Sequence, residues 1–214
     1  MEKDLGHIRR EYSKHTLEET NLPEDPIILF NQWLDDARKS VNPEPTAMIL
    51  STIEKNGQPS SRVVLLKKIE DDLFIFFTNY NSRKASDIND HIRVSALFFW
   101  PELERQVKIC GFANQIGVQD SDSYFHSRPR DSQIGAWASP QSKEVPDRQF
   151  LENEFECYRK KFQADKQIPR PPHWGGYAIS PSRIEFWQGR EARLHDRIEY
   201  RKSKNEWHSV RLAP

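Results

Sequence analysis

Three arginines, a histidine and a tryptophan lie in one short segment near the carboxyl end of the chain, between Ile184 and Arg197. Side chains of an extended strand alternate between two faces, so Arg193, His195 and Arg197 are predicted to project from the same face. Three cationic or titratable groups on one face repel one another unless an anionic or electron-rich group lies between them. The pattern favours a phosphorylated, aromatic ligand. The alternative is the solvated outer face of an edge strand.

A second basic cluster, Ser82-Arg83-Lys84, is predicted to begin a short helix. The chain has only eight glycines and no glycine-rich dinucleotide or P-loop motif, so a phosphate must be bound by side chains and helix ends. A capping serine, free backbone N–H groups, an arginine and a lysine together form such an anion site. The alternative is a solvent-facing helix start with tolerated charges.

Arg62 and Lys67 lie in a β-rich run, five positions apart. A regular strand sends them to opposite faces, so they are predicted to bind different anions unless a bulge intervenes. For Lys67, which is followed by Lys68, the alternative is a strand end that reaches solvent.

Tyr124, Arg128 and Ser132 follow one another at intervals of four, which places them on one face of a continuous helix. Pro129 predicts a break in that helix between Arg128 and Ser132. A phenol, a guanidinium and a hydroxyl suit a phosphate, whose oxygens arginine binds in a bidentate manner. The alternative is a capping serine beside a surface arginine.

Trp187 and Gln106 are weaker signals. Strand alternation places Trp187 with Glu185 on a polar face, while Ile184 and Phe186 are expected in the core. A tryptophan on a polar face indicates a ligand or subunit contact.

His195 titrates near neutral pH, and the flanking Arg193 and Arg197 are expected to disfavour its protonation. Orientation and hydrogen bonding are therefore the favoured role of His195, with proton removal as a secondary one.

The elements that must position these residues begin with a polar segment, 1–24, which lacks apolar periodicity and is interpreted as a flexible arm. Asp25-Pro26 then predicts a helix start, followed at helical spacing by apolar residues from Ile27 to Ala37. Strands are predicted over Ala47–Ile53 and Ser61–Ile69, joined by an Asn56-Gly57 turn, over Leu73–Thr78, and near Arg93–Trp100 and Arg105–Asn114.

The region from about 117 to 163 is helical in character and includes a charged helix near Asp147–Phe162. Strands return near Gly176–Ser180, Arg183–Gln188, Leu194–Tyr200 and Trp207–Leu212. The pattern predicts a mainly β, antiparallel barrel with helical additions. Residues 25–214 are expected to form a single domain with helical insertions near 117–163.

Acidic and basic residues are equally frequent, 32 of each, and the formal net charge is zero. No global field attracts nucleic acid or an anionic membrane, so a cationic site must be local. No apolar run is long enough to span a membrane, and the amino-terminal segment lacks the apolar core of a signal peptide. Cys110 and Cys157, the only cysteines, lack metal-type spacing and fit a reducing compartment, although one disulfide is left open. We expect a cytoplasmic protein without a metal, a membrane or a nucleic-acid partner.

Ten motifs, in order and spread over nearly the whole chain, carry a family resemblance. They are Arg9-Arg-Glu-Tyr12, Asp25-Pro26, Pro45-Thr-Ala-Met48, Arg62-Val-Val-Leu-Leu-Lys67, Ser82-Arg-Lys84, Leu103-Glu-Arg-Gln106, Arg128-Pro-Arg-Asp-Ser-Gln-Ile-Gly-Ala-Trp137, Trp174-Gly-Gly176, the segment 184–197 and Arg211-Leu-Ala-Pro214. The chain closely resembles the pyridoxine (pyridoxamine) 5′-phosphate oxidase family. The resemblance implies an FMN-binding split β-barrel and a homodimer with the flavin between subunits.

The resemblance also implies roles for individual residues. The flavin mononucleotide would be contacted by Arg62, Val63, Val64, Leu65, Leu66, Lys67, Phe77, Thr78, Arg83, Lys84, Gln106, Gln141, Ser142, Trp187 and Arg197. The substrate phosphate would be contacted by Lys67, Tyr124, Arg128 and Ser132, and the pyridine ring by Arg193 and His195, the two residues assigned to catalysis. Arg9 and Tyr12 would fold over the substrate as a lid that excludes water. The family often has tyrosine at position 77, so a hydroxyl contact is lost there.

The implied reaction is the oxidation of pyridoxine 5′-phosphate and pyridoxamine 5′-phosphate to pyridoxal 5′-phosphate, with dioxygen as acceptor. One rival is a split-barrel flavin reductase or dehydrogenase, which needs no second phosphate set. Another is a pyridoxal phosphate carrier without flavin. A nucleic-acid-binding barrel is a third, disfavoured by the zero net charge.

Overall fold

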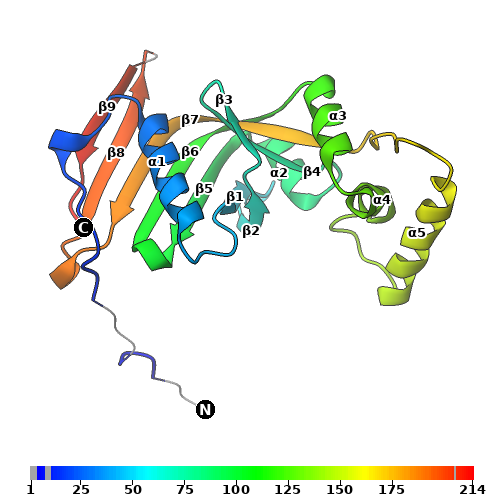
Figure 1. Ribbon diagram of the computed structural model, residues 1–214, viewed down its shortest axis with the longest axis horizontal. Coiled ribbons are helices and arrows are strands. Elements are labelled where there is room, and N and C mark those ends of the chain that lie inside the picture. Colours follow the sequence, from blue (N-terminus) through cyan, green and yellow to red (C-terminus); the bar gives the residue numbers. More distant parts are fainter. Residues whose placement is uncertain (1–3, 8–10, 205) are drawn as a thin grey trace. The chain divides into compact units, whose positions relative to one another are not determined.

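The computed structural model describes residues 4–7, 11–204 and 206–214, and their contacts divide the chain into two units. The first unit is Met1–Ile49, Ser95–Cys110 and Pro181–Pro214. The second is Leu50–Val94 and Gly111–Ser180. In the described residues nine strands form one sheet, in the order β2-β1-β5-β6-β7-β4-β3, with β8 pairing to β7 and β9 to β8 (Figure 1). Four strands contribute residues to both units: β1 (Ala47–Ile53), β5 (Arg93–Trp100), β6 (Arg105–Gln115) and β7 (Trp174–Gln188).

The first unit contains α1 (Pro26–Lys39), β8 (Asp196–Ser203), β9 (Glu206–Arg211) and three short 3-10 turns, η1 (Glu19–Asn21), η2 (Pro101–Leu103) and η3 (Glu191–Arg193). The predicted start of α1 is confirmed, because the Asp25 carboxylate accepts the Ile27 N–H at 2.8 Å and Pro26 occupies the first turn. Phe30 and Trp33 of this helix are buried. Trp33 packs edge-on against Phe186 at 5.2 Å. Aromatic burial of this kind anchors the core of the unit.

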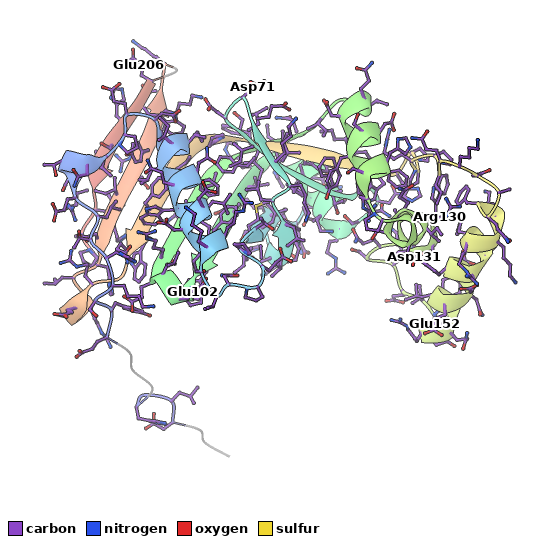
Figure 2. The ribbon with its side chains drawn as sticks, in the orientation of Figure 1. Asp71, Glu102, Arg130, Asp131, Glu152 and Glu206 are labelled. Atoms are coloured by element: carbon purple, nitrogen blue, oxygen red, sulfur yellow. The ribbon has the colours of Figure 1, made fainter. Side chains whose placement is uncertain are left out.

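The second unit contains β2 (Pro59–Leu65), β3 (Lys68–Glu70), β4 (Leu73–Asn79), α2 (Arg83–Asp90), α3 (Val118–Ser127), α4 (Arg130–Ala138) and α5 (Arg148–Lys161). Its core includes Phe125, Ile134, Phe162, Ile168 and Trp174. The labelled side chains of Arg130, Asp131 and Glu152 show the charged character of α4 and α5 (Figure 2). The helical region expected near 117–163 is thus formed by three helices.

The prediction of one continuous strand over Ser61–Ile69 is wrong, because the segment is divided between β2 and β3. The two halves pair with different neighbours, β2 with β1 and β3 with β4. Between them the Lys67 N–H donates to Ile75 O at 2.8 Å. The opposite-face argument for Arg62 and Lys67 therefore does not apply, since no continuous strand joins them.

The strands predicted at Gly176–Ser180 and Arg183–Gln188 are one strand, β7. Its first part pairs antiparallel with β4 and its second part with β8, and Pro181 lies where the partner changes. A proline is tolerated there because it removes no hydrogen bond from either ladder.

The strand predicted from Leu194 starts at Asp196, so Arg193 and His195 are not strand residues. Ala192 and Arg193 adopt left-handed backbone angles, with φ of 53° and 61°, which an extended strand cannot contain. The prediction that Arg193, His195 and Arg197 share a strand face is therefore wrong.

The described part of the predicted 1–24 arm makes specific contacts within the first unit. The Glu104 carboxylate accepts the Ser13 and Lys14 N–H groups at 2.9 and 3.1 Å, and Leu17 is buried. The flexible arm and the single domain over 25–214 stay predictions.

Candidate active site

A pocket of about 570 Å³ lies entirely within the second unit. Strands β2 and β4, the helices α2, α3 and α4 and the start of β7 supply its walls. Its lining is Val63, Val64, Leu65, Lys67, Phe77, Thr78, Asn79, Lys84, Tyr124, Arg128, Pro129, Ser132, Gly135, Ala136, Ser139, Gln141 and Trp174. The whole predicted substrate-phosphate set therefore lines one cavity with two members of the predicted flavin-phosphate set, Lys84 and Gln141.

Lys84 is the most constrained basic group of the pocket. It is 9% exposed, and its ammonium donates to Thr78 Oγ1 at 3.1 Å, to Gln141 Oε1 at 3.0 Å and to Ser82 Oγ at 3.3 Å. Burial, with a further contribution from nearby Arg62, lowers the pKa of Lys84 to about 8. All three acceptors are neutral oxygens; Asp87, whose charge opposes the lowering of the Lys84 pKa, is paired with Arg62 at 3.5 Å. The site therefore favours an added anion.

The helix start predicted at Ser82 is confirmed, because α2 begins at Arg83 with Ser82 as its N-cap. The expected side-chain cap is wrong: Ser82 Oγ donates to Asn79 O at 2.7 Å instead of accepting an N–H of the first turn. Ser82 thus closes the turn that follows β4.

Arg62, Arg83 and Ser142 do not line the pocket. The Arg62 guanidinium donates to Thr52 Oγ1 at 2.7 Å and to Ser60 O at 3.0 Å, and it pairs with the buried Asp87 at 3.5 Å. It joins the β1–β2 hairpin to α2, the helix that carries Lys84. Arg83 and Ser142 are exposed, whereas Leu66, another predicted flavin contact, is buried at 3% exposure and does not line the pocket either.

Tyr124, Arg128 and Ser132 are brought together although the helix breaks between them, as Pro129 predicts. Helix α3 ends at Ser127, Arg128 has extended backbone angles, and α4 begins at Arg130. The buried Gln133 side chain donates to Arg128 O at 2.8 Å, which fixes the break. Lys67, which is exposed, lines the same pocket.

The Arg128 guanidinium lies over the Trp174 ring at 4.6 Å, and its buried Nη1 has no hydrogen-bond partner among the described residues. Burial lowers the pKa of Arg128, and burial raises the pKa of neighbouring Tyr124. A buried N–H without a partner costs about 1–3 kcal/mol, so an anion bound there recovers that free energy.

Three stacked aromatic rings form the wall beside these groups. Phe77 stacks on Tyr124 at 3.8 Å and on Trp174 at 5.5 Å. Phe77 therefore has a packing role that needs no hydroxyl.

Sequence reasoning missed Trp174, Asn79 and Ser139 as pocket residues. Trp174 precedes Gly175 and Gly176, where an added Cβ would overlap Tyr80 and Ile116 respectively. The Trp-Gly-Gly run was the available signal for this close packing.

Gln106, Trp187, Arg193, His195, Arg197 and Tyr12 belong to the first unit. Tyr12 packs against Trp187 at 5.7 Å and against His195 at 5.8 Å, and Trp187 lies 4.6 Å from His195. Arg193 is exposed, and Gln106 is half-buried on β6. Arg9, the other predicted lid residue, lies outside the described residues.

Arg197 is the one member of the predicted cationic face that lies in a strand, opposite Trp187. Its guanidinium pairs with the buried Glu185 at 2.8 Å, and Lys108 pairs with the same carboxylate at 2.5 Å. Burial alone would raise the pKa of Glu185, but these two cations hold it below its usual value. Arg197 therefore already has a carboxylate partner within the protein, which it shares with Lys108.

No cluster of three or more metal-ligating side chains occurs in the described ranges 4–7, 11–204 and 206–214. Within the same ranges, none of the helices has both the length and the apolar character needed to cross a membrane.

Comparison with known proteins places this geometry in a class. A family model described as pyridoxamine 5′-phosphate oxidase matches residues 34–162, and one described as the pyridoxine 5′-phosphate oxidase C-terminal dimerisation region matches residues 174–214. A pyridoxine/pyridoxamine 5′-phosphate oxidase of Leptospira interrogans is 46% identical over 215 residues, covering 100% of each chain.

Two solved structures are similar. PhzG of Burkholderia lata, determined in complex with tetrahydrophenazine-1-carboxylic acid, superimposes with a TM-score of 0.86 at 31% identity, covering 93% of this chain and 98% of PhzG. A pyridoxamine 5′-phosphate oxidase-related, FMN-binding protein of Nostoc punctiforme shares the fold, with a TM-score of 0.68 at 18% identity, over 87% of this chain and 95% of its own.

The fold is therefore of the split-barrel class, as the sequence predicts. The chain belongs to the pyridoxamine 5′-phosphate oxidase family. Its membership supports an oxidase-like function towards pyridoxine or pyridoxamine 5′-phosphate.

Proposed function

We propose that the protein is an FMN-dependent oxidase that converts pyridoxine 5′-phosphate and pyridoxamine 5′-phosphate to pyridoxal 5′-phosphate. Dioxygen is the acceptor and hydrogen peroxide the by-product, with ammonia released from the amine. The observation that supports the proposal is that one pocket of the second unit is lined by Lys67, Tyr124, Arg128 and Ser132 together with Lys84 and Gln141.

The residues present fit a flavin phosphate on one side of the pocket. Buried Lys84 and Thr78 form a polar cluster with the exposed Gln141, and no hydrogen bond or ion pair of Lys84 to a carboxylate is found among the described residues. A phosphate there would restore the ordinary charge balance of Lys84. Arg62, Arg83 and Ser142 stay predicted flavin contacts, and Arg62 also holds α2 against the hairpin.

The second set, Lys67, Tyr124, Arg128 and Ser132, fits the 5′-phosphate of the substrate. The unpartnered Arg128 Nη1 calls for an acceptor, and a phosphate oxygen satisfies it. A flavin reductase acting on an unphosphorylated substrate has no use for this set. PhzG was determined with a carboxylic acid ligand that carries no phosphate.

FMN, when bound, would accept a hydride from the substrate carbon that bears the alcohol or amine and pass the electrons to dioxygen. The protein binds and orients: the phosphate set anchors one end of the substrate, while Arg193 and His195 would contact its pyridine ring. The alcohol yields the aldehyde directly, and the amine yields an imine that water hydrolyses.

A homodimer with FMN at the subunit interface is part of the proposal. The C-terminal segment matches a model described as a dimerisation region, and the pocket contains only one of the two groups of predicted site residues. A flavin between subunits allows the other group to come from the second copy. Both cysteines are free, which supports a reducing, cytoplasmic location.

The test is the visible absorption spectrum of the purified protein before and after addition of pyridoxine 5′-phosphate without oxygen. We expect a flavin band that bleaches and then returns in air. A flavin band that does not respond to pyridoxine 5′-phosphate would favour a flavin reductase that acts on another substrate. A protein that binds no FMN on reconstitution would be a carrier, and the proposal would be rejected.

A further inference from the structure

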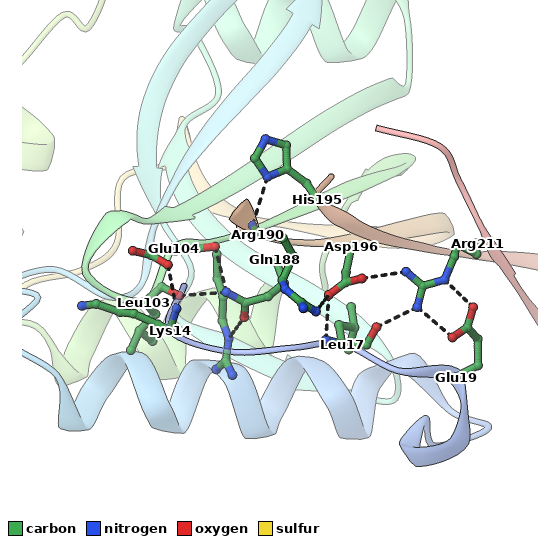
Figure 3. Close-up of polar contacts among 11 residues, drawn as sticks. Lys14, Leu17, Glu19, Leu103, Glu104, Gln188, Arg190, His195, Asp196 and Arg211 are labelled. Atoms are coloured by element: carbon green, nitrogen blue, oxygen red, sulfur yellow. Dashed lines mark hydrogen bonds and ion pairs between the residues drawn. The ribbon is translucent and has the colours of Figure 1, made fainter. Parts of the chain in front are cut away.

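The loop between β7 and β8 carries Arg193 and His195, and hydrogen bonds of the first unit fix its backbone. Gly189 N–H donates to Glu104 O at 2.8 Å. The Gln188 side-chain amide donates to the same oxygen at 3.2 Å (Figure 3). Leu194 N–H donates back to Glu191 O at 3.1 Å, which closes the left-handed turn. The loop therefore holds a defined geometry around His195.

Within this loop the Arg190 backbone N–H donates to His195 Nδ1 at 3.1 Å (Figure 3). A ring nitrogen that accepts a hydrogen bond uses its lone pair and carries no proton. The proton of the neutral imidazole then resides on Nε2. In this tautomer Nε2 is a donor and the ring has no lone pair left for a substrate proton.

The Arg190 side chain connects the start of the loop to Asp196, the first residue of β8. Its Nη1 lies 2.9 Å from Asp196 Oδ2, so an ion pair joins the two ends of the segment that carries His195. Asp196 is 8% exposed and is itself held by Arg211 at 2.7 Å and by the Leu17 N–H at 3.1 Å. Figure 3 shows these contacts meeting at the Asp196 carboxylate.

The groups around His195 keep the imidazole neutral. Burial and the neighbouring Arg193 lower its pKa, and Asp196 opposes them. From the other elements only the rings of Tyr12 and Trp187 are found against it among the described residues. No carboxylate accepts a proton from Nδ1, as one would in a histidine that serves as a base.

We propose that Arg190 and Asp196 are positioning residues that fix His195 as its Nε2–H tautomer, so that His195 donates a hydrogen bond to an acceptor on the aromatic ring of the substrate. It does not remove a proton. The identity of the substrate rests on the proposed function, whereas the tautomer does not.

The test is nitrogen-15 NMR of the histidine rings in the FMN-loaded, oxidised protein, with His195→Gln identifying the His195 signals. We expect the neutral His195 to carry its proton on Nε2. Arg190→Ala keeps the backbone N–H at position 190 but removes the side chain that pairs with Asp196, so the loop backbone is no longer held there. We expect the Nε2–H to Nδ1–H ratio to fall by about fivefold, the factor that corresponds to one neutral hydrogen bond, and the pKa of His195 to rise.

Arg190→Lys, which retains a cation beside Asp196, should restore most of the ratio. Arg201→Ala is the matched control, because Arg201 also pairs with a buried β8 carboxylate, Glu199, at 2.7 Å. It should leave His195 unchanged. A wild-type His195 protonated on Nδ1 would overturn the inference, and so would equal effects of Arg190→Ala and Arg201→Ala. Turnover of pyridoxine 5′-phosphate is measured separately, so a failure of the proposed function can be distinguished from a failure of the inferred His195 tautomer.

Discussion

At the scale of single residues, the pocket is built on two cations that the protein itself leaves incompletely neutralised. Lys84 contacts only neutral oxygens, and Arg128 has a buried N–H without a partner among the described residues. Such groups destabilise an empty pocket and stabilise an occupied one, because an anion recovers the cost of desolvation. Stability and ligand affinity are therefore expected to change in opposite directions.

Lys84→Met should weaken FMN binding by about 10- to 100-fold, since a charge-assisted hydrogen bond contributes roughly 1.5–3 kcal/mol. The affinity should also fall above pH 8 in the wild type, because the pKa of Lys84 in the flavin-free protein is about 8 and only its protonated form attracts phosphate. Titration of FMN fluorescence at several pH values measures both effects.

The same pKa predicts an opposite trend for the stability of the flavin-free protein. Between pH 8 and the ordinary lysine value of 10.5, the unfolded chain binds more protons at this residue than the folded one, so the Lys84 contribution makes stability rise with pH. Lys84→Met should abolish both pH trends. Lys68→Met, which removes an exposed lysine paired with Glu70, should abolish neither, and a pH-independent FMN affinity in the wild type would contradict the prediction.

At the scale of elements, strands and helices supply most of the pocket wall, whereas two of its basic residues, Lys67 and Arg128, lie in breaks between elements. The β1–β2 hairpin turns at Gly57, whose φ of 89° is in the left-handed region. The break after α3 presents Arg128, and the break between β2 and β3 presents Lys67. The break at Arg128 is held by the Gln133 side chain, and the break at Lys67 by the hydrogen bond from the Lys67 N–H to Ile75 O.

Gly57→Ala should lower the free energy of unfolding by about 1 kcal/mol, because alanine is strained at a positive φ. Nothing lies within 4 Å of the added Cβ, so strain and not a clash is the expected cause. Urea denaturation measures the effect through the midpoint at constant slope. Gln58→Ala in the same turn is the control and should change stability by less than about 0.5 kcal/mol. Equal stability of the two variants would count against a strained turn.

At the scale of the whole molecule, the predicted site residues fall into two groups that belong to different units. The pocket group lies in the second unit, and the Trp187, His195 and Arg197 group lies in the first. A proposed homodimer with the flavin at the interface allows each group to act with the group of the other subunit.

Subunit mixing tests this arrangement. Arg128→Met changes one residue of the pocket group, and Arg193→Ala changes one residue of the first-unit group. Each variant alone should be nearly inactive towards pyridoxine 5′-phosphate. Random exchange of subunits should restore about a quarter of the wild-type activity, because half of the dimers then contain one intact site of two. Mixing Arg128→Met with itself is the control. Exchange without recovery of activity would show that both groups act within one subunit.

The sequence determined the order and type of nearly all elements and the chemical character of the pocket. Apolar periodicity and local signals such as Asp25-Pro26, Asn56-Gly57 and Pro129 act over a few residues, so they can be read without tertiary structure. Tyr124, Arg128 and Ser132, which the sequence grouped by their spacing, line one pocket although the helix breaks between them. Their roles towards a ligand stay predictions.

Only the tertiary structure decided which of these residues already have hydrogen-bond or ion-pair partners within the protein. Arg62 is bonded to Thr52, Ser60 and Asp87, and Arg197 is paired with Glu185, whereas Arg128 keeps an unpartnered N–H. It also divided the run 61–69 between two neighbours and placed His195 in a left-handed loop rather than a strand. Pairing, burial and hydrogen bonding depend on residues distant in the sequence, and local pattern cannot supply those partners.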